Sequence, residues 1–472
     1  MRQHKTRVNR SRLIAAEVLI DVEKHQKFAN LVLPKALRAE QTTNPHFTDR
    51  DAAFTAELVY GTIRQQGLLD FALAPHCSQP LTDLDAPVLV CLRLGAYQLL
   101  FLRVADHAAI GETVEVAKEV AGEGPARFVN AVLRSLQREG SDATLGRVNA
   151  ISDPRARLAT EHSHPGWIVA DLANSLTARG LPEGELGEAL AANNVPARVT
   201  LVARPGLITP TELAQEVEEV LQAEASQGLL SEYAVVMREG DPGALPSVRS
   251  AAAAVQDEGS QFAALLLAEA PLVGSDTRWL DLCAGPGGKS ALLAALGRER
   301  GVTLVANEVN PRRSRLVERS VQALDNVEIT VQDGRTFSHG KLFDRTLVDA
   351  PCLGLGALRR RPESRWRHSR ADLDDLIPLQ RDLLERGIAS TRSGGVIAWV
   401  TCSPHVDETL RQVEDALSGG KVELLDAATL AQGLTPEDLD LGGGSEVASQ
   451  TVQLWPHRHG TDAMFIALLR RK

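Results

Sequence analysis

The chain has 472 residues, enough for two or three domains, with 44% hydrophobic residues and a formal net charge of −10. Its five cysteines include no CxxC pair, which argues against a zinc site and a disulfide framework and favours reduced thiols in the cytoplasm. The basic N-terminus is followed by no apolar signal core, and every apolar run is shorter than the roughly 20 residues of a membrane helix. A soluble protein is therefore expected.

Residues 1–145 show the apolar spacing of a helical bundle. Helices are predicted at 12–24, from 49 onward, and at 88–102, 107–120 and 126–136. A basic arm precedes them and contains no acid: Arg2, Lys5, Arg7, Arg10 and Arg12. The arm suits either a solvated tail or a contact with nucleic acid, which needs a basic surface rather than a basic protein.

Residues 146–245 combine a predicted strand at 195–201 with a helix at 210–223. Thr209 is the expected N-cap of that helix, with Pro210 at its first position. His162 and His164 lie two residues apart, but no third ligand follows at a metal-binding spacing, so no metal site is predicted. Residues 246–472 form the last predicted domain.

This last domain opens with a strand, a glycine turn and a helix. Residues 279–282 are apolar enough for a buried strand, residues 283–289 (CAGPGGK) make a sharp turn, and a helix is predicted from Ser290. Glycines let the backbone approach a ligand, and the helix N-terminus offers free N–H groups. The turn is neither a dinucleotide fingerprint nor a Walker loop.

Three further apolar runs each end in an acid: Glu308, Asp333 and Asp349. A fourth run, 394–401, ends at Cys402. In an open parallel sheet these ends line one edge, where ligands bind, and an acid after the second strand suits ribose hydroxyls. One such acid could be a helix cap, but three in register favour a site in a doubly wound α/β domain.

Two cysteines stand in comparable settings, Cys352 in Asp349-Ala350-Pro351-Cys352 and Cys402 in Thr401-Cys402-Ser403-Pro404. A single cysteine is most often a small core residue. Two at the ends of adjacent predicted strands instead indicate a thiol-based catalytic site.

Taken together, these motifs resemble the Sun/Fmu (RsmB-type) family of S-adenosylmethionine-dependent RNA cytosine-5 methyltransferases. The family loop usually reads D-x-C-A-A-P-G-G-K-[ST]; here Gly285 replaces the second alanine, and Val400 replaces the usual serine before Thr401. Further matches are residues 255–261 (VQDEGSQ), the D-A-P-C motif, residues 354–363 with Trp366, and the T-C-S motif. The resemblance covers nearly the whole chain.

The family implies a Rossmann-like methyltransferase domain at 246–472, a NusB-like helical RNA-binding domain at 1–145, and a connector with a small α/β subdomain at 146–245. It implies that Cys402 is the nucleophile, that Cys352 assists product release and that Asp349 faces the cytosine and the methyl group. It implies a site for S-adenosylmethionine made by Cys283, Ala284, Gly285, Pro286, Gly287, Gly288, Lys289, Glu308, Asp333 and Asp349. Glu308 would hold the ribose and Asp333 the adenine end. The partner of Lys289 is left open.

RNA is the implied partner, with 16S ribosomal RNA as the substrate and Arg359, Arg360 and Arg361 as phosphate contacts. Transfer RNA is an alternative substrate, and a non-catalytic RNA-binding assembly factor is an alternative function. DNA cytosine-5 methyltransferases use a Pro-Cys thiol as nucleophile, but the Thr-Cys-Ser motif and the helical N-terminal region argue against that class. A monomer is expected.

Overall fold

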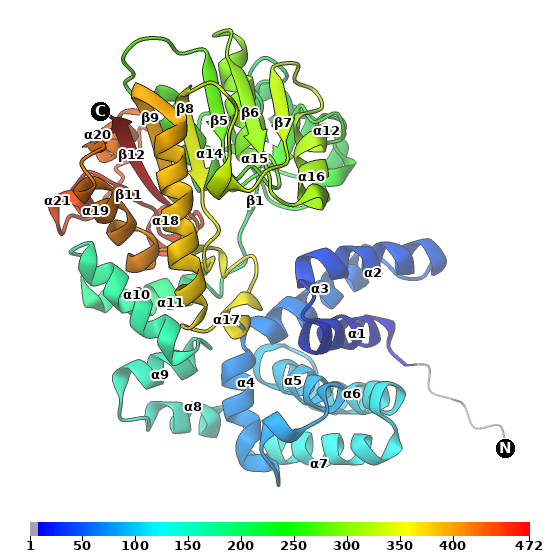
Figure 1. Cartoon of the computed structure of the whole chain (residues 1–472). Coiled ribbons are helices and arrows are strands. Elements are labelled where there is room, and N and C mark those ends of the chain that lie inside the picture. The colour runs from blue at the N-terminus through cyan, green and yellow to red at the C-terminus, as the bar shows by residue number, and fades with distance from the viewer. Residues whose placement is uncertain (1–7) are drawn as a thin grey trace. The chain divides into compact units, whose positions relative to one another are not determined.

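The structure is a computed structural model that describes residues 8–472. It divides into two compact units. The first contains the chain up to Ala170, together with Asn193–Val195 and Leu358–Arg367. The second contains Asp171–Ala192, Pro196–Ala357 and His368–Lys472. Each unit is coloured along the chain in Figure 1 and is described here by itself.

The first unit is helical, as the apolar spacing predicts. Its helices are α1 (Arg10–His25), α2 (Ala29–Thr43), α3 (Asp49–Arg64), α4 (Gln66–Leu73), α5 (Ala86–Phe101), α6 (Asp106–Ala121), α7 (Glu123–Glu139), α8 (Ser141–Asn149) and α9 (Pro154–Glu161). The short 3₁₀ helices η1 (Ala74–His76) and η2 (Leu81–Asp83) precede α5. Helix α17 (Ser364–Arg367) lies in the segment Leu358–Arg367 of this unit. Helix α5 is buried along most of its length and forms the centre of the bundle. Helix α10 (Gly166–Ala178) begins in this unit and continues into the second.

The described part of the basic arm is not a free tail. Arg10 pairs with the Glu40 carboxylate, and Arg12 is buried with its Nε donating to the Gln98 side chain at 2.7 Å. Both belong to α1, so a free tail, one of the two alternatives, does not describe these two residues, and a contact of the arm with nucleic acid stays a prediction. Arg2, Lys5 and Arg7 lie outside the described residues.

A small antiparallel sheet forms one part of the second unit. Its order is β2-β3-β1-β4, from β1 (Val199–Ala203), β2 (Ala225–Gln227), β3 (Ala234–Met237) and β4 (Ala253–Val255). Helix α12 (Pro210–Leu221) packs on it, and Thr209 and Glu212 form the capping box that begins this helix. The first strand begins four residues later than predicted.

The large sheet has the order β10-β12-β9-β8-β5-β6-β7, with β11 paired to β12. Its strands are β5 (Arg278–Asp281), β6 (Thr303–Asn307), β7 (Val327–Thr330), β8 (Phe343–Asp349), β9 (Thr391–Thr401), β10 (Val422–Leu425), β11 (Val452–Gln453) and β12 (Phe465–Arg471). Strands β5 to β9 are parallel, which confirms the predicted strand set. Strand β12 runs antiparallel to β9 and β10, so the sheet is mixed rather than all parallel.

Helices cover both faces of the large sheet. Alternate residues of β9 belong to different cores: Ala398 packs with α14 (Glu258–Glu269) and α15 (Gly288–Arg298), whereas Trp399 packs with α18 (Asp372–Ser390) and α19 (Leu410–Ser418). In Figure 1, α18 runs along its face of the sheet in front of β8 and β9. This burial on two faces explains why the predicted strands read as continuous apolar runs.

The remaining short elements of the second unit connect these layers. They are η3 (Glu183–Glu185), α11 (Leu186–Ala192), η4 (Pro242–Ala244), α13 (Pro246–Arg249), α16 (Pro311–Val321), η5 (Gly334–Thr336), η6 (Leu355–Ala357), η7 (Val406–Glu408), α20 (Ala427–Gly433), α21 (Glu446–Ser449) and α22 (Pro456–His459). Among residues 8–472, no helix is long and apolar enough to span a bilayer.

Candidate active site

The carboxyl ends of the five parallel strands bring the predicted site residues to one edge of the large sheet. The glycine turn follows β5, Glu308 follows β6 and Asp333 lies shortly after β7. Asp349 is the last residue of β8, with Cys352 three residues beyond it, and Cys402 follows β9. The sheet thus gathers segments that are separated by more than 100 residues of sequence.

The two predicted catalytic thiols are in contact. Cys352 Sγ and Cys402 Sγ lie 3.4 Å apart. Their loops are joined by the backbone, because Ala350 N–H donates to the Val400 carbonyl and Gly356 N–H donates to the Cys402 carbonyl, both at 2.9 Å. The hydrogen bond between the two thiols lowers the pKa of Cys402, and the same bond, with burial, raises the pKa of Cys352. Cys402 is therefore the more acidic thiol of the pair and Cys352 the less acidic one.

Lys289 links the glycine turn to this thiol pair. Its Nζ donates to the Asp349 carboxylate at 2.8 Å, which supplies the partner that the sequence left open. Burial lowers the pKa of Lys289, but the Asp349 carboxylate more than offsets this and the net shift is upward. The Asp349 carboxylate raises the pKa of Cys402 and the Lys289 ammonium group lowers it, so the ion pair as a whole does not lower the pKa of this thiol.

The buried acid Asp281 accepts hydrogen bonds from both ends of the glycine turn. The Asp281 carboxylate accepts the Cys283 N–H at 3.3 Å and the Ser290 hydroxyl at 2.6 Å, and burial raises its pKa to about 7. Burial likewise raises the pKa of Cys283, which makes this thiol a poor nucleophile. Gly287 has φ +108°, and a Cβ there would lie 2.9 Å from the Val317 Cα of α16. Helix packing and backbone torsion thus both require glycine at 287.

Glu308 and Asp333 differ in exposure. Glu308 is 3% exposed, and its carboxylate accepts the Gly285 N–H at 3.1 Å and the Asn310 N–H at 2.9 Å. Asp333 is half-buried and accepts the backbone and side-chain N–H groups of Arg335, which lower its pKa. Glu308 therefore joins the first two loops of the edge, while Asp333 stands nearer to solvent.

Asn307 is a site residue that the sequence analysis missed. Its Nδ2 donates to the carbonyls of Leu282 and Gln332 at 3.1 and 3.0 Å, and its Oδ1 accepts the Thr330 hydroxyl at 2.9 Å. The fully buried amide ties together the ends of β5, β6 and β7. A polar residue closing an otherwise apolar run was the available signal.

The turn also fits the cofactor that the resemblance implies. Helix α15 begins at Gly288, and its N-cap is Gly287, so the first N–H groups have no side-chain cap and can donate hydrogen bonds to an anionic group. A Cβ on Gly285 would lie 2.1 Å from the Glu308 carboxylate, so the small residue lets the loop approach that acid closely. A carboxylate-bearing, ribose-containing donor matches these groups.

The predicted RNA-binding arginines lie in a segment whose neighbouring arginines have structural roles. Arg365 is fully buried and donates to the carbonyls of Arg64, Ser163 and Asn193 and to the Asn194 side chain, at 2.8–3.2 Å. The Arg367 guanidinium stacks 4.5 Å from the Phe28 ring centroid.

Arg359, Arg360 and Arg361 themselves differ in exposure. Arg359 is buried, Arg360 is half-buried and Arg361 is exposed. Their role toward RNA stays a prediction, with Arg361 the most accessible of the three.

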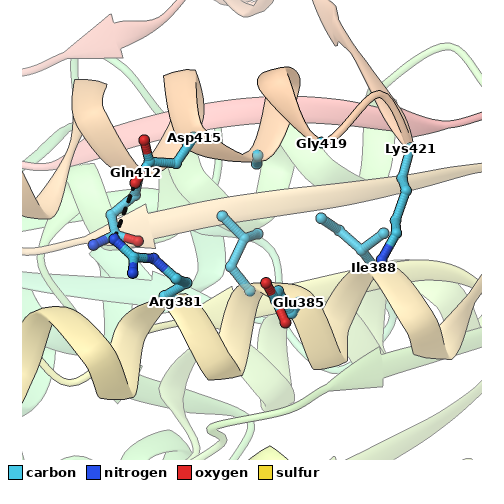
Figure 2. Close-up of a pocket in the computed structure, with 9 residues that line it drawn as sticks. Arg381, Glu385, Ile388, Gln412, Asp415, Gly419 and Lys421 are labelled. Atoms are coloured by element: carbon cyan, nitrogen blue, oxygen red, sulfur yellow. Dashed lines mark hydrogen bonds and ion pairs between the residues drawn. The ribbon is translucent and has the colours of Figure 1, made fainter.

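A separate cavity of about 380 Å³ lies between α18 and α19 (Figure 2). Leu384 and Ile388 line it, and Arg381 donates to Asp415 at 3.1 Å across it. None of the predicted site residues lines this cavity. Among residues 8–472, no group of three His, Cys, Asp or Glu side chains is arranged to hold a metal ion.

Comparisons with known proteins agree with this architecture. Residues 270–470 match the 16S rRNA methyltransferase RsmB/F family, and residues 9–138 match the NusB family. A Mycobacterium tuberculosis protein, named as a methyltransferase without a stated substrate, is 46% identical over 98% of this chain and 96% of its own. Ribosomal RNA small subunit methyltransferase B of Pseudomonas putida is 34% identical over 83% of this chain and 85% of its own.

Solved structures share the fold. The crystal structure of PH0851 superposes with a TM-score of 0.78 at 20% identity, covering 98% of this chain and 99% of that one. NSun6 from Pyrococcus horikoshii, solved with SFG, gives a TM-score of 0.52 at 17% identity, covering 64% of this chain and 97% of its own.

Proposed function

Because the chain belongs to the RsmB/F family of 16S rRNA methyltransferases, we propose that it methylates carbon 5 of a cytosine in 16S ribosomal RNA through a covalent thiolate adduct. The methyl donor of the family is S-adenosylmethionine and the partner is RNA.

One observation carries this proposal: two thiols in contact at the sheet edge, beside a Lys–Asp pair. The 3.4 Å contact between Cys352 and Cys402 provides a nucleophile and a second thiol within one site. The Lys289–Asp349 pair places a cation and a carboxylate at the same edge. An RNA-binding assembly factor without catalytic activity would need none of these reactive groups.

The proposed reaction begins with addition of Cys402 to the base. The Cys402 thiolate forms a bond to C6 of cytosine, and the C5–C6 π electrons move toward C5, which becomes nucleophilic. When bound, S-adenosylmethionine supplies an electrophilic methyl group that C5 takes up. Transfer of the C5 proton to water then returns an electron pair to the ring, the bond from C6 to Cys402 breaks, and the thiolate leaves.

Two other residues would orient the cytosine and assist release of the methylated product. Asp349 would accept a hydrogen bond from the polar edge of the cytosine, and Cys352 would assist the release step by proton exchange with the leaving sulfur. The target base must be turned out of its stack, because attack at C6 occurs from the face of the ring.

The donor site would be formed by the glycine turn and the acids beside it. We propose that Cys283–Lys289 and the N-terminus of α15 hold the methionine part of the donor. Glu308 would hold the ribose and Asp333 the adenine end. The arrangement supports this because the free N–H groups of α15 and the two acids lie along the same sheet edge.

The three predicted domains would divide the task. We assign RNA binding to residues 1–145, which contain the NusB match, a connecting role to 146–245, and catalysis to 246–472. Arg359, Arg360 and Arg361 would contact phosphates. With ribosomal RNA as the substrate, the protein would act in the cytoplasm, as a monomer.

The proposal is tested by incubating the protein with labelled donor and transcribed 16S ribosomal RNA, then mapping 5-methylcytosine. We expect one methylated cytosine with the wild type and none with Cys402→Ala, which should still bind the donor. Cys352→Ala should trap an RNA–protein adduct that runs as a slow band on a denaturing gel and is absent from the double variant. Methylation at a comparable rate without Cys402 would refute the mechanism. Methylation of transfer RNA but not of 16S ribosomal RNA would show that transfer RNA is the substrate.

A further inference from the structure

Glu408 is a fully buried acid that touches the loop of Cys352. It ends η7, six residues after Cys402, and its side chain has no exposed surface. Its Oε1 accepts the Leu353 N–H at 2.8 Å and the Gln380 Nε2–H at 3.0 Å. Burying a carboxylate is costly, and burial raises the pKa of Glu408 although the hydrogen bonds oppose this shift. The free-energy cost of burying this carboxylate suggests that Glu408 has a specific role.

Gln380 completes a clamp around Cys352. Its Nε2 donates both to Glu408 and to the Pro351 carbonyl, the latter at 2.9 Å. The peptide group before Cys352 is therefore held by Gln380, and the peptide group after it is held by Glu408. Because Gln380 lies on α18 and is itself buried, the clamp is anchored in a long helix rather than in another loop.

The clamp joins the two thiol loops to each other. Glu408 comes from the segment that follows Cys402, yet its carboxylate holds the backbone beside Cys352. The Glu408 side chain thus connects the two loops whose sulfur atoms lie 3.4 Å apart.

The carboxylate of Glu408 also affects the pKa of Cys352. The bond to Cys402 and burial raise the pKa of Cys352, and the Glu408 carboxylate adds to this effect. The same carboxylate therefore holds the second thiol in place and favours its protonated form.

We propose that Glu408, supported by Gln380, is the positioning residue that holds the Cys352 thiol against Cys402 and thereby sets the rate of product release. This inference rests on the proposed covalent function. A residue needed only for folding would affect donor binding, adduct formation and release alike. A positioning residue for Cys352 should affect release selectively.

The test compares Glu408→Ala, Gln380→Ala and Glu408→Gln in the full-length chain. We expect Glu408→Ala to bind the donor within about twofold of wild type and to form the adduct in a single turnover. Its multiple-turnover rate should fall roughly 100-fold, because small displacements of reacting groups have effects of that size. The Cys402-dependent adduct should accumulate as it does with Cys352→Ala. Glu408→Gln keeps the acceptor for Leu353 N–H and should recover most of the turnover.

The outcomes separate the inference from the function on which it rests. If Cys352→Ala traps an adduct but Glu408→Ala and Gln380→Ala turn over at the wild-type rate, the positioning role is refuted alone. It is refuted equally if adduct formation and release decline together in these variants while the donor still binds. If Glu408→Ala does not fold, Gln380→Ala and Glu408→Gln decide by the same measurements. If no variant, Cys352→Ala included, forms an adduct, the covalent mechanism fails and this inference fails with it.

Discussion

The carboxyl edge of the large sheet and the segment Leu358–Arg367 follow one another in the chain but differ in what surrounds them. At the edge, each reactive residue lies at the end of a strand or within three residues of it, and the parallel register brings the residues together. In Leu358–Arg367, Arg365 is instead surrounded by carbonyl oxygens of the first unit. A functional role can be predicted for a residue whose neighbours are set by a regular sheet. It cannot be predicted for an arginine whose partners are loop carbonyls far away in sequence.

Oxidation of the two thiols should produce the largest effect and tests whether Cys352 and Cys402 are in contact at the sheet edge. A mild diazene oxidant such as diamide should take two hydrogens from Cys352 and Cys402 and join their sulfurs, because the thiols already touch. Methyl transfer should fall in proportion to the fraction of chains cross-linked, since the bond removes the nucleophile, and a dithiol should restore it. Mass spectrometry of the linked peptides identifies the bond.

Cys352→Ser is the matched control, because it leaves Cys402 with no thiol in contact. This variant should form no such linked peptide. A wild-type protein that gains no Cys352–Cys402 bond under conditions that oxidise its other accessible thiols would contradict the edge geometry.

Arg365→Ala should produce the largest change in stability. The variant leaves the buried carbonyls of Arg64, Ser163 and Asn193 without their donor, and we expect a loss of about 3 kcal/mol in the free energy of unfolding of the first unit. Urea unfolding followed by circular dichroism measures this. Arg361→Ala, at an exposed position of the same segment, should change stability by less than about 0.5 kcal/mol. Equal effects would mean that the two arginines do not differ as described.

The sequence predicted the edge well because its signals are local. Apolar runs ending in Glu308, Asp349 and Cys402 identify strands, and the parallel α/β fold then implies their meeting. The contacts of Asn307 and Glu408 could not be predicted, since each depends on atoms from loops that only the folded sheet brings near. The antiparallel strand β12 was likewise missed, because no motif marks it.

The pH dependence of Cys402 sharpens the roles of the two thiols. The hydrogen bond with Cys352 lowers the pKa of Cys402, and the thiolate is the reactive form, so reactivity rises as pH increases through that pKa. Removing this hydrogen bond in Cys352→Ala should move the rise in reactivity to higher pH, because the bond is the largest cause that lowers the pKa of Cys402. Cys352→Ser keeps a donor and should move it less. Alkylation rates at Cys402, resolved by peptide mass spectrometry across pH, measure the shift; an unmoved profile in Cys352→Ala would show that this hydrogen bond does not tune Cys402.

The smallest expected effect concerns RNA at the exposed end of the arginine segment. If Arg361 neutralises one phosphate, Arg361→Ala should reduce the slope of log affinity against log salt by about 0.7 to 0.9 without altering donor affinity. Arg298→Ala is the matched control, because Arg298 is also exposed and forms a surface ion pair with Asp325 at the end of α15 away from the glycine turn. Filter binding over a salt series should show the change for Arg361 and none for Arg298. If both variants keep the wild-type slope, Arg361 contacts no phosphate, its guanidinium serves only the contact with the Phe28 ring, and the phosphate contacts must come from another surface.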